Sequence, residues 1–301
     1  MERKQVRLGL IGYGEVGSGL GLGLRGQGLE HVVAYDIAAF EGTFSALIQS
    51  RAKEAGVKLV RTPRELAQES DYVIVAVPGS ACVDVAGAFA TVLTAQHVLI
   101  DIGSATPRVK VRVGEILSPK GVRVADGGIM GSPLQDGYKI LIKSSGPAAQ
   151  TVADVLNPWG MRFDVVGATL GAGSGIKIVR SVVMKGMEAL FVECALGASR
   201  YGIEDEVFAS ISEFVDARPF METVKFLVRT DVIHAARRAE EAAMSAEALE
   251  EVGVEPVMTR STSAVLQRSA DLRLKEQFQG VVPDDYKVAV EAIDRALRIP
   301  A

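Results

Sequence analysis

The chain has few of the residues that build disulfide frameworks or transition-metal sites. Its 301 residues include two cysteines, Cys82 and Cys194, and three histidines, His31, His97 and His234. The cysteines lie far apart and lack both metal-ligand spacing and the density of a disulfide scaffold. We therefore expect no structural metal site, and we interpret both cysteines as small buried hydrophobic residues rather than reactive thiols.

The sequence also lacks an excess of positive charge and any long apolar run. Thirty-three basic and 37 acidic residues give a net charge of -4 and a pI of about 5.6, so we expect no nucleic-acid partner. No apolar run reaches the length of about 18 residues that a membrane-spanning helix needs. The first residues, MERKQVRLGLIGYG, hold glycines where a signal peptide needs an uninterrupted apolar segment. We expect a cytoplasmic protein without a membrane partner.

What is present predicts two domains. A chain of 301 residues with 48% hydrophobic and 23% charged residues is globular and longer than one core usually organises. After Gly175, alanine, glutamate, arginine, methionine and leucine recur with helical spacing, which predicts an all-α C-terminal domain whose first helix runs from about Ser174 to Tyr201. Before it, β-rich runs alternate with helical segments, which predicts a doubly wound α/β sheet. The expected strands are residues 6–11, 31–35, 58–60, 72–77, 97–102, 122–125, 138–142 and 163–166.

Three glycines follow the first of these strands. Gly12, Gly14 and Gly17 form a Gly-x-Gly-x-x-Gly string between a predicted strand and a predicted helix. In a dinucleotide site the first glycine makes the tight turn, the second lets the backbone approach the pyrophosphate, and the third lets helix pack on strand. We therefore predict a cofactor loop rather than a merely flexible one. Its expected contacts are Gly12, Tyr13, Gly14, Glu15, Val16 and Gly17.

An acidic residue follows the second predicted strand. Asp36 lies nineteen residues beyond Gly17, where a carboxylate accepts hydrogen bonds from the adenosine ribose hydroxyls. It would repel a 2′-phosphate, and Ile37, Ala38 and Ala39 supply no cation to neutralise one. The pattern favours NAD over NADP, unless folding brings a lysine or arginine to the site. We place a Rossmann-type dinucleotide-binding domain at residues 1–167 and the helical domain at 168–301.

Three further motifs follow in order. They are Asp-Ile-Gly-Ser-Ala-Thr-Pro at 101–107, Asp-Gly-Gly-Ile-Met-Gly-Ser at 126–132 and Gly-Ala-Gly-Ser-Gly-Ile-Lys at 171–177. Together with the glycine loop, they resemble the β-hydroxyacid dehydrogenase family, which includes 3-hydroxyisobutyrate and 6-phosphogluconate dehydrogenases, over nearly the whole chain. Residues 177–186 and 234–241 are similar to a branch of 6-phosphogluconate dehydrogenase-like proteins whose C-terminal domain is of unknown function.

The resemblance implies that Lys177 is the catalytic lysine and that the loops after residue 101 and around Gly131 hold the substrate. We expect Val77, Pro78 and Ser104 beside the cofactor, and as substrate contacts Ser104, Gly131, Ser132, Arg180, Ser181 and Lys185. The chain departs from the family at Gly103, at Met130-Gly131-Ser132 and at Arg180-Ser181, where the family has serine, Ser-Gly-Gly and Asn-Asn. The resemblance therefore does not specify the substrate, any decarboxylation or the physiological direction.

Helical geometry gathers polar side chains around Lys177. At about 100° per residue, one arc of the long helix holds Lys177, Arg180, Ser181, Met184, Lys185 and Glu188. The arc is either solvated or faces a cleft, and the glycine-rich entrance at 171–175 favours the cleft. A lysine among hydroxyl and cationic neighbours has a lowered pKa and can exchange a proton with a substrate hydroxyl. Arg180 and Lys185 would bind a carboxylate, so we expect a small anionic hydroxy or keto acid. Ser104, Ser132 and Ser181 are either hydroxyl contacts or ordinary cap and turn residues.

These patterns predict an NAD(P)-dependent dehydrogenase acting on CH–OH groups, with Lys177 as general acid and base. Imine reduction is an alternative, and so is a redox sensor that binds NAD without turnover. The resemblance also implies a homodimer through the helical domains. His234, Arg237, Arg238 and Glu241 share one helical face, which is either a solvated salt-bridge stripe or a basic face that supports the substrate carboxylate across the interface.

Overall fold

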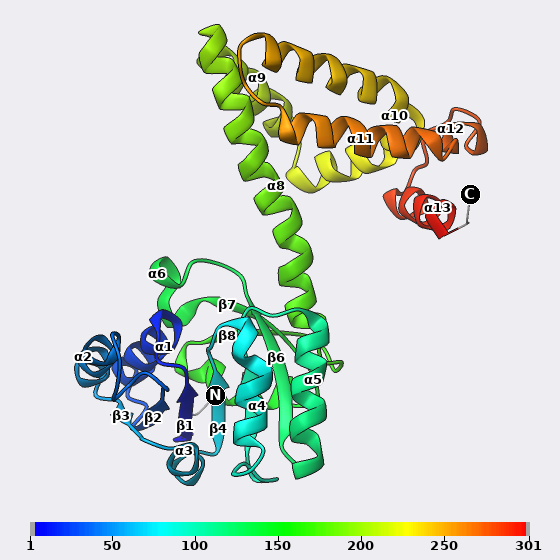
Figure 1. Cartoon of the computed structure of the whole chain (residues 1–301). Helices are drawn as coiled ribbons and strands as arrows, with labels where there is room; N and C mark the ends of the chain where they lie inside the picture. Colours follow the sequence, from blue (N-terminus) through cyan, green and yellow to red (C-terminus); the bar gives the residue numbers. More distant parts are fainter. Residues whose placement is uncertain (1–3, 299–301) are drawn as a thin grey trace. The chain divides into compact units, whose positions relative to one another are not determined.

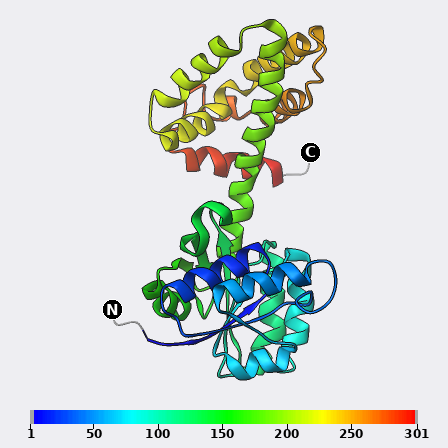
Figure 2. The same cartoon turned by 90° about the vertical axis from the view of Figure 1, so that its left-hand side faces the viewer.

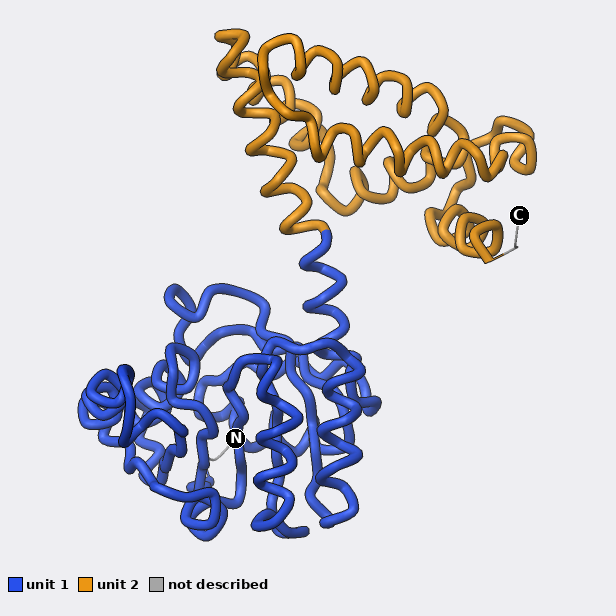
Figure 3. Tube along the Cα trace, viewed as in Figure 1, with its two compact units in different colours: residues 1–182 blue, residues 183–301 orange. Residues whose placement is uncertain are grey.

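The computed structural model describes residues 4–298 and divides the chain into two compact units, residues 1–182 and 183–301 (Figure 3). The division falls inside helix α8 (Ala172–Tyr201), which closely matches the helix expected from Ser174 to Tyr201. The domain boundary at 167/168 lies just before this helix and stays a prediction.

An eight-stranded sheet forms the centre of the first unit (Figure 1). Its order is β3-β2-β1-β4-β5-β6-β7-β8, and neighbouring strands are parallel except for β6 and β7. The expected doubly wound sheet is confirmed. The strands are β1 (Arg7–Ile11), β2 (His31–Tyr35), β3 (Lys58–Leu59), β4 (Tyr72–Val75), β5 (Val98–Asp101), β6 (Arg123–Ile129), β7 (Leu141–Ser145) and β8 (Arg162–Gly167).

Strand β7 differs from the expectation in position and direction. It begins at Leu141 rather than at residue 138, because Gly137–Lys139 form a 3-10 turn, η3. The connection from β6 contains the short helix α6 (Pro133–Asp136) and no long crossover helix, so the chain returns antiparallel to β6.

Helices cover both faces of the sheet, and Figure 2 shows α1 and α2 in blue over one of them. Strand side chains alternate between the two cores: Ile74 packs on the side of α1, α2 and α7, whereas Val73 and Val75 pack on the side of α3, α4 and α5. The helices are α1 (Glu15–Gly26), α2 (Ser45–Ala55), α3 (Pro63–Glu69), α4 (Cys82–Phe89), α5 (Pro107–Leu117) and α7 (Ala149–Leu156), with 3-10 turns η1 (Gly79–Ala81), η2 (Ser118–Lys120) and η4 (Asn157–Trp159).

Up to residue 298, the second unit contains helices and no strand, as expected. The long helices α10 and α11 pack side by side, and α10 shares a small core with α12 and α13, which includes Val232, Leu274 and Ala289 (Figure 1). Besides the end of α8, its helices are α9 (Glu204–Asp216), α10 (Phe220–Glu251), α11 (Val257–Asp271), α12 (Leu274–Gln277) and α13 (Tyr286–Arg298). Within residues 4–298, no helix combines the length and the apolar character needed to cross a membrane.

Candidate active site

The glycine loop at the end of β1 leaves room for a ligand. Gly12 has a φ of 87°, in the left-handed region, and a Cβ there would lie 2.6 Å from the Ala76 carbonyl oxygen. A Cβ on Gly17 would collide with the carbonyl oxygen of Gly12, whereas a Cβ on Gly14 would meet nothing within 4 Å. Gly12 and Gly17 therefore close the turn, and Gly14 keeps the N-terminus of α1 open to a pyrophosphate.

The Asp36 carboxylate joins the end of β2 to this loop. Its Oδ2 accepts a hydrogen bond from the Tyr13 backbone N–H at 2.7 Å, and its Oδ1 accepts one from Ala38 N–H at 2.8 Å. A carboxylate has about four acceptor positions, so these two bonds leave room for ribose hydroxyls. The loop and Asp36 thus fit a dinucleotide.

The other predicted residues of the loop contribute in different ways. The Tyr13 side chain is fully buried beneath α1, close to Gly21, and burial raises its pKa to about 12 despite the opposing effect of Arg51. Any part that Tyr13 has in cofactor binding therefore belongs to its backbone. Val16 packs against the core, and Glu15 is exposed in the first turn of α1.

The loops after β4 and β5 lie against each other. A Cβ on Gly79 would collide with the Ser104 carbonyl oxygen, and one on Gly103 would lie 2.7 Å from the Val77 carbonyl oxygen. Val77 also borders Gly12. The predicted residues Val77, Pro78 and Ser104 are therefore grouped at the carboxyl ends of parallel strands, where doubly wound folds bind ligands.

Lys177 lies at the same edge of the sheet. Its Nζ donates a hydrogen bond to Ser104 Oγ at 2.6 Å, across 73 positions of sequence. Lys177 is half-buried, and its pKa is lowered first by burial and second by the positive charge of Lys110. The pair joins a hydroxyl to a lysine that gives up its proton more readily than usual.

Sequence reasoning missed Lys110. Its Nζ lies 2.8 Å from Asp101 Oδ1 and donates to the Asp101 carbonyl oxygen at 3.0 Å, and both side chains are buried. Asp101 Oδ1 also accepts the Gly103 N–H at 2.9 Å, which ties the ion pair to the loop that carries Ser104. A signal was present, because Lys110 lies on the same helical face as Val113 and Leu117, where an exposed lysine does not belong.

The cysteines fit the expectation in part. Cys82 is buried beside Asp101, and burial together with the Asp101 charge raises the pKa of its thiol to about 12, which disfavours the reactive thiolate. Cys194 is only half-buried. Among residues 4–298, His, Cys, Asp and Glu side chains form no group of three or more that could hold a metal ion.

The predicted substrate residues are less closely grouped. Gly131 and Ser132 follow β6, and the Ser132 N–H donates to Asp136 Oδ2 at 3.1 Å. Ser181 donates its hydroxyl to the Lys177 carbonyl oxygen at 2.8 Å, within its own helix, and Arg180 is exposed. Lys185 belongs to the second unit, where it pairs with Glu188 at 2.6 Å.

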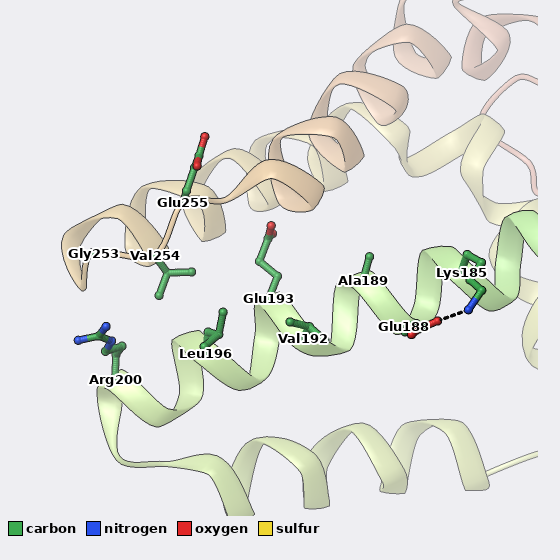
Figure 4. A pocket seen from close by; sticks show the side chains of 10 residues that line it. All are labelled: Lys185, Glu188, Ala189, Val192, Glu193, Leu196, Arg200, Gly253, Val254 and Glu255. Atoms are coloured by element: carbon green, nitrogen blue, oxygen red, sulfur yellow. Dashed lines mark hydrogen bonds and ion pairs between the residues drawn. The ribbon is translucent and has the colours of Figure 1, made fainter. Parts of the chain in front are cut away.

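The second unit has a groove of about 720 Å³ along α8 (Figure 4). Lys185 lines one end of it and Arg200 the other, opposite the loop that contains Val254 and Glu255 (Figure 4). Between them, Glu193 accepts hydrogen bonds from the backbone N–H groups of Met258 and Thr259, so it caps α11. Lys177 and Ser104 belong to the other unit and do not line this groove.

Comparisons with known proteins identify the family of the first unit. A family model described as the NAD binding domain of 6-phosphogluconate dehydrogenase matches residues 7–167, and a domain of unknown function, DUF1932, matches residues 198–269. The 2-(hydroxymethyl)glutarate dehydrogenase of Eubacterium barkeri is 23% identical over 220 residues, which are 69% of this chain and 68% of that protein.

Two solved structures share the fold. One is a conserved protein of unknown function with structural similarity to 3-hydroxyacid dehydrogenases, at 28% identity and a TM-score of 0.61, over 88% of this chain and 98% of that one. The other, an imine reductase from Aspergillus terreus in complex with NADPH4, has 17% identity and a TM-score of 0.74, over 97% and 99% of the two chains. At that identity it shows the fold alone.

The resemblance, the fold class and the NAD cofactor expected from the sequence are therefore confirmed. The glycine loop, the sheet and the family model agree that this chain belongs to the oxidoreductase family that carries the NAD binding domain of 6-phosphogluconate dehydrogenase.

Proposed function

We propose that the protein transfers a hydride between NAD and a small hydroxy or keto acid, with Lys177 as general acid and base. The hydrogen bond from Lys177 Nζ to Ser104 Oγ carries this proposal. It lies at the sheet edge where the glycine loop and Asp36 fit a dinucleotide. The name of the Eubacterium relative, a dehydrogenase of a hydroxymethyl dicarboxylate, supports the substrate class.

The chemistry divides between cofactor and chain. Bound NAD supplies a hydride acceptor, or a hydride donor in its reduced form. The glycine loop and the N-terminus of α1 would hold its pyrophosphate, and Asp36 its ribose. Lys177 takes the proton of the substrate hydroxyl in oxidation and returns it to the oxygen in reduction. The lowered pKa of Lys177 increases the fraction of neutral amine that is ready to accept this proton.

Arg180 is our assignment for the substrate carboxylate. It is exposed and follows Lys177 by three residues, so both side chains lie on one face of α8. Its planar guanidinium suits a bidentate contact with a carboxylate. The secondary candidates are Gly131, Ser132, Ser181 and Lys185. The Ser132 N–H and the Lys185 ammonium group already contact carboxylates, and the Ser181 hydroxyl already donates to the backbone of its own helix.

Imine reduction is the second candidate, and Asp136 favours it. The Asp136 carboxylate lies against the Gly131–Ser132 loop. A negative charge there suits a cationic iminium better than a carboxylate. The same site would then reduce a C=N bond instead of a C=O bond.

We also propose a homodimer through the helical domains. In the single chain, Val179 and Val182 are 70% and 72% exposed on α8, the helix that begins in the first unit and continues into the second. Exposed apolar side chains gathered on one element are typical of protein contact sites. Arg237 forms an ion pair with Glu241, and Arg238 donates a hydrogen bond to the Thr230 hydroxyl. Either arginine would have to give up this contact in order to bind a substrate in a partner's active site.

One screen tests the function. Purified protein is mixed with NAD or NADP and a panel of hydroxy acids, and separately with NADH and keto acids or ketone–amine mixtures, while NADH absorbance is followed. We expect turnover with a hydroxy or keto acid. Turnover with ketone–amine mixtures alone would support imine reduction, and binding of NADH without turnover of any substrate would support a redox sensor.

A further inference from the structure

Asp126, near the middle of β6, is a buried carboxylate that contacts the start of α8. Its side chain is buried, with a residue exposure of 1%. Oδ1 accepts hydrogen bonds from the Ser145 hydroxyl and, at 2.9 Å, from the Gly171 N–H. Oδ2 accepts the Ser174 N–H at 2.8 Å, and Ser145 Oγ accepts the Gly173 N–H at 2.9 Å. Asp126 and Ser145 thus accept hydrogen bonds from three backbone N–H groups at the start of α8, those of Gly171, Gly173 and Ser174.

Two glycines bring the same helix turn against the sheet. A Cβ on Gly128, in β6, would lie 2.6 Å from the Gly173 carbonyl oxygen and 2.9 Å from Lys177 Cβ. A Cβ on Gly173 would collide with the Lys143 carbonyl oxygen of β7. The first turn of α8 therefore packs directly against the backbone of β6 and β7, and Lys177 packs directly against Gly128. We call Asp126, Gly128, Ser145 and Gly173 the α8 anchor.

We propose that the α8 anchor, with Asp126 at its centre, positions Lys177 opposite Ser104. This inference rests on the proposed function for the role of Lys177. The first N–H groups of a helix have no partners within the helix, and a carboxylate at that end is also favoured by the helix dipole. Because Lys177 follows Ser174 by three residues, its position is set by the turn that Asp126 holds.

The geometry makes Asp126 a positioning residue rather than a catalytic one. Its carboxylate is enclosed by the hydroxyl and N–H groups described above, so it faces the protein and not a substrate. Displacing a catalytic group by about 1 Å can cost about 100-fold in rate. Loosening the anchor should therefore reduce turnover without removing any group that binds NAD.

The first test compares Asp126→Asn and Ser145→Ala with Glu193→Gln. Glu193 is the matched control, since it is also a buried carboxylate that caps a helix, but it caps α11. We expect the two anchor variants to lower kcat about 10- to 100-fold with unchanged NAD affinity. Glu193→Gln should lose thermal stability and keep its kcat. Equal kcat in Asp126→Asn and the natural protein would overturn the inference.

A second readout does not depend on any substrate. Lysines are reductively methylated with ¹³C, the Lys177 resonance is assigned with Lys177→Arg, and its pKa is measured by NMR titration. Removing the Asp126 charge alone would lower the pKa of Lys177, whereas release of Lys177 from its half-buried position would raise it. Lys110 on α5 and Arg180 on α8 are unchanged in every variant. We expect the pKa to rise, and a fall would contradict the anchor.

Gly128→Ala tests the anchor without changing a charge. Its new Cβ must displace the start of α8, so we expect the same fall in kcat and the same rise in the Lys177 pKa. Gly87→Ala is the control, because a Cβ at Gly87 meets nothing within 4 Å. An unchanged Lys177 titration in Gly128→Ala would refute the anchor. If instead Lys177→Ala retains full turnover, the proposed function fails while the titration still tests the anchor.

Discussion

Lys177 and its hydrogen bond to Ser104 carry the proposed proton transfer. Lys177→Ala should lower turnover about 100-fold or more, because no other group is assigned to the substrate proton. NADH affinity, measured by fluorescence titration, should not change, since the glycine loop and Asp36 lie on other elements. Lys275→Ala, an exposed lysine of α12, is the control. Full turnover in Lys177→Ala with a good substrate would assign the proton to another group.

The pH profile of oxidation should follow the titration of Lys177. Burial, and then Lys110, lowers the pKa of Lys177, and the neutral amine is the base, so kcat/KM should rise with pH and level off below the usual range of lysine. Lys110→Met removes a positive charge and leaves the Asp101 carboxylate unpaired. Both changes raise the pKa of Lys177, so the rising limb should move to higher pH. Lys120→Met, which changes an exposed lysine of η2, should leave the rising limb in place. A limb that moves to lower pH would contradict this electrostatic account.

Asp36 should determine the choice between the two dinucleotides. The natural protein should bind NAD more tightly than NADP, and Asp36→Ala should reduce the ratio of the two affinities because the repulsion of a 2′-phosphate is lost. Asp36 also accepts the Tyr13 N–H, so both affinities should fall and the ratio is the informative quantity. Equal affinities for NAD and NADP in the natural protein would refute this assignment.

At the scale of elements, Glu193 links α8 to the start of α11. Burial would raise the pKa of Glu193, but hydrogen bonds from Thr259 and Met258 outweigh it and hold the pKa below the ordinary value of 4.5. When the pKa of a carboxyl is lower in the folded protein than in the unfolded chain, its carboxylate stabilises the fold fully at pH values above the unfolded-state pKa. This contribution is lost as the pH falls through the folded-state pKa.

Glu193→Gln should therefore lower the free energy of unfolding by about 1–3 kcal/mol at neutral pH. The difference from the natural protein should shrink as pH falls below 4.5. Denaturant unfolding at several pH values measures it, with Glu206→Gln, an exposed glutamate of α9, as the control. A difference that is independent of pH would show that the carboxylate charge is not responsible.

Most elements were predictable because their patterns are local. Strand β4 is apolar, as a strand buried on both faces must be. The helix after Gly171 was predictable from the helical spacing of its apolar residues up to Gly202. The sequence pattern predicts the start of strand β7 about three residues too early, because Tyr138 has strand-like character. Its ring lies close to Gly23 of α1, a contact made from a 3-10 turn. Apolar character alone does not distinguish the two conformations.

The candidate site was predictable where a motif carries the chemistry. Motif order pointed to Ser104 and Lys177, which lie in contact, although their roles remain proposals. Lys110 and Asp126 were not assigned roles, because each acts through partners that only the fold brings near. Lys110 reaches Asp101 nine positions away, and Asp126 reaches donors 45 and 48 positions away. Spacing alone does not specify such pairs.

For the whole molecule, the proposed dimer can be tested through α8. Light scattering should report the molar mass of a dimer. Val182→Glu should lower that mass toward the value of a monomer, because it places a charge in the interface. Val281→Glu is the control, since Val281 is 67% exposed in the loop before α13. A fully active monomer would contradict the assembly. The proposed substrate role of the basic face would fail separately if Arg237→Ala and Arg238→Ala both left KM unchanged.

The α8 anchor also bears on the order in which a nascent chain becomes stable. When synthesis has passed Gly167, the residues of all eight strands have been made, but the backbone N–H groups of Gly171 and Ser174 that donate to the Asp126 carboxylate have not. A buried acceptor without its partners costs about 1–3 kcal/mol, and more when it is charged. The sheet therefore gains its full stability only after the start of α8 leaves the ribosome, so a fragment that ends at residue 182 retains these donors and one that ends at residue 167 does not.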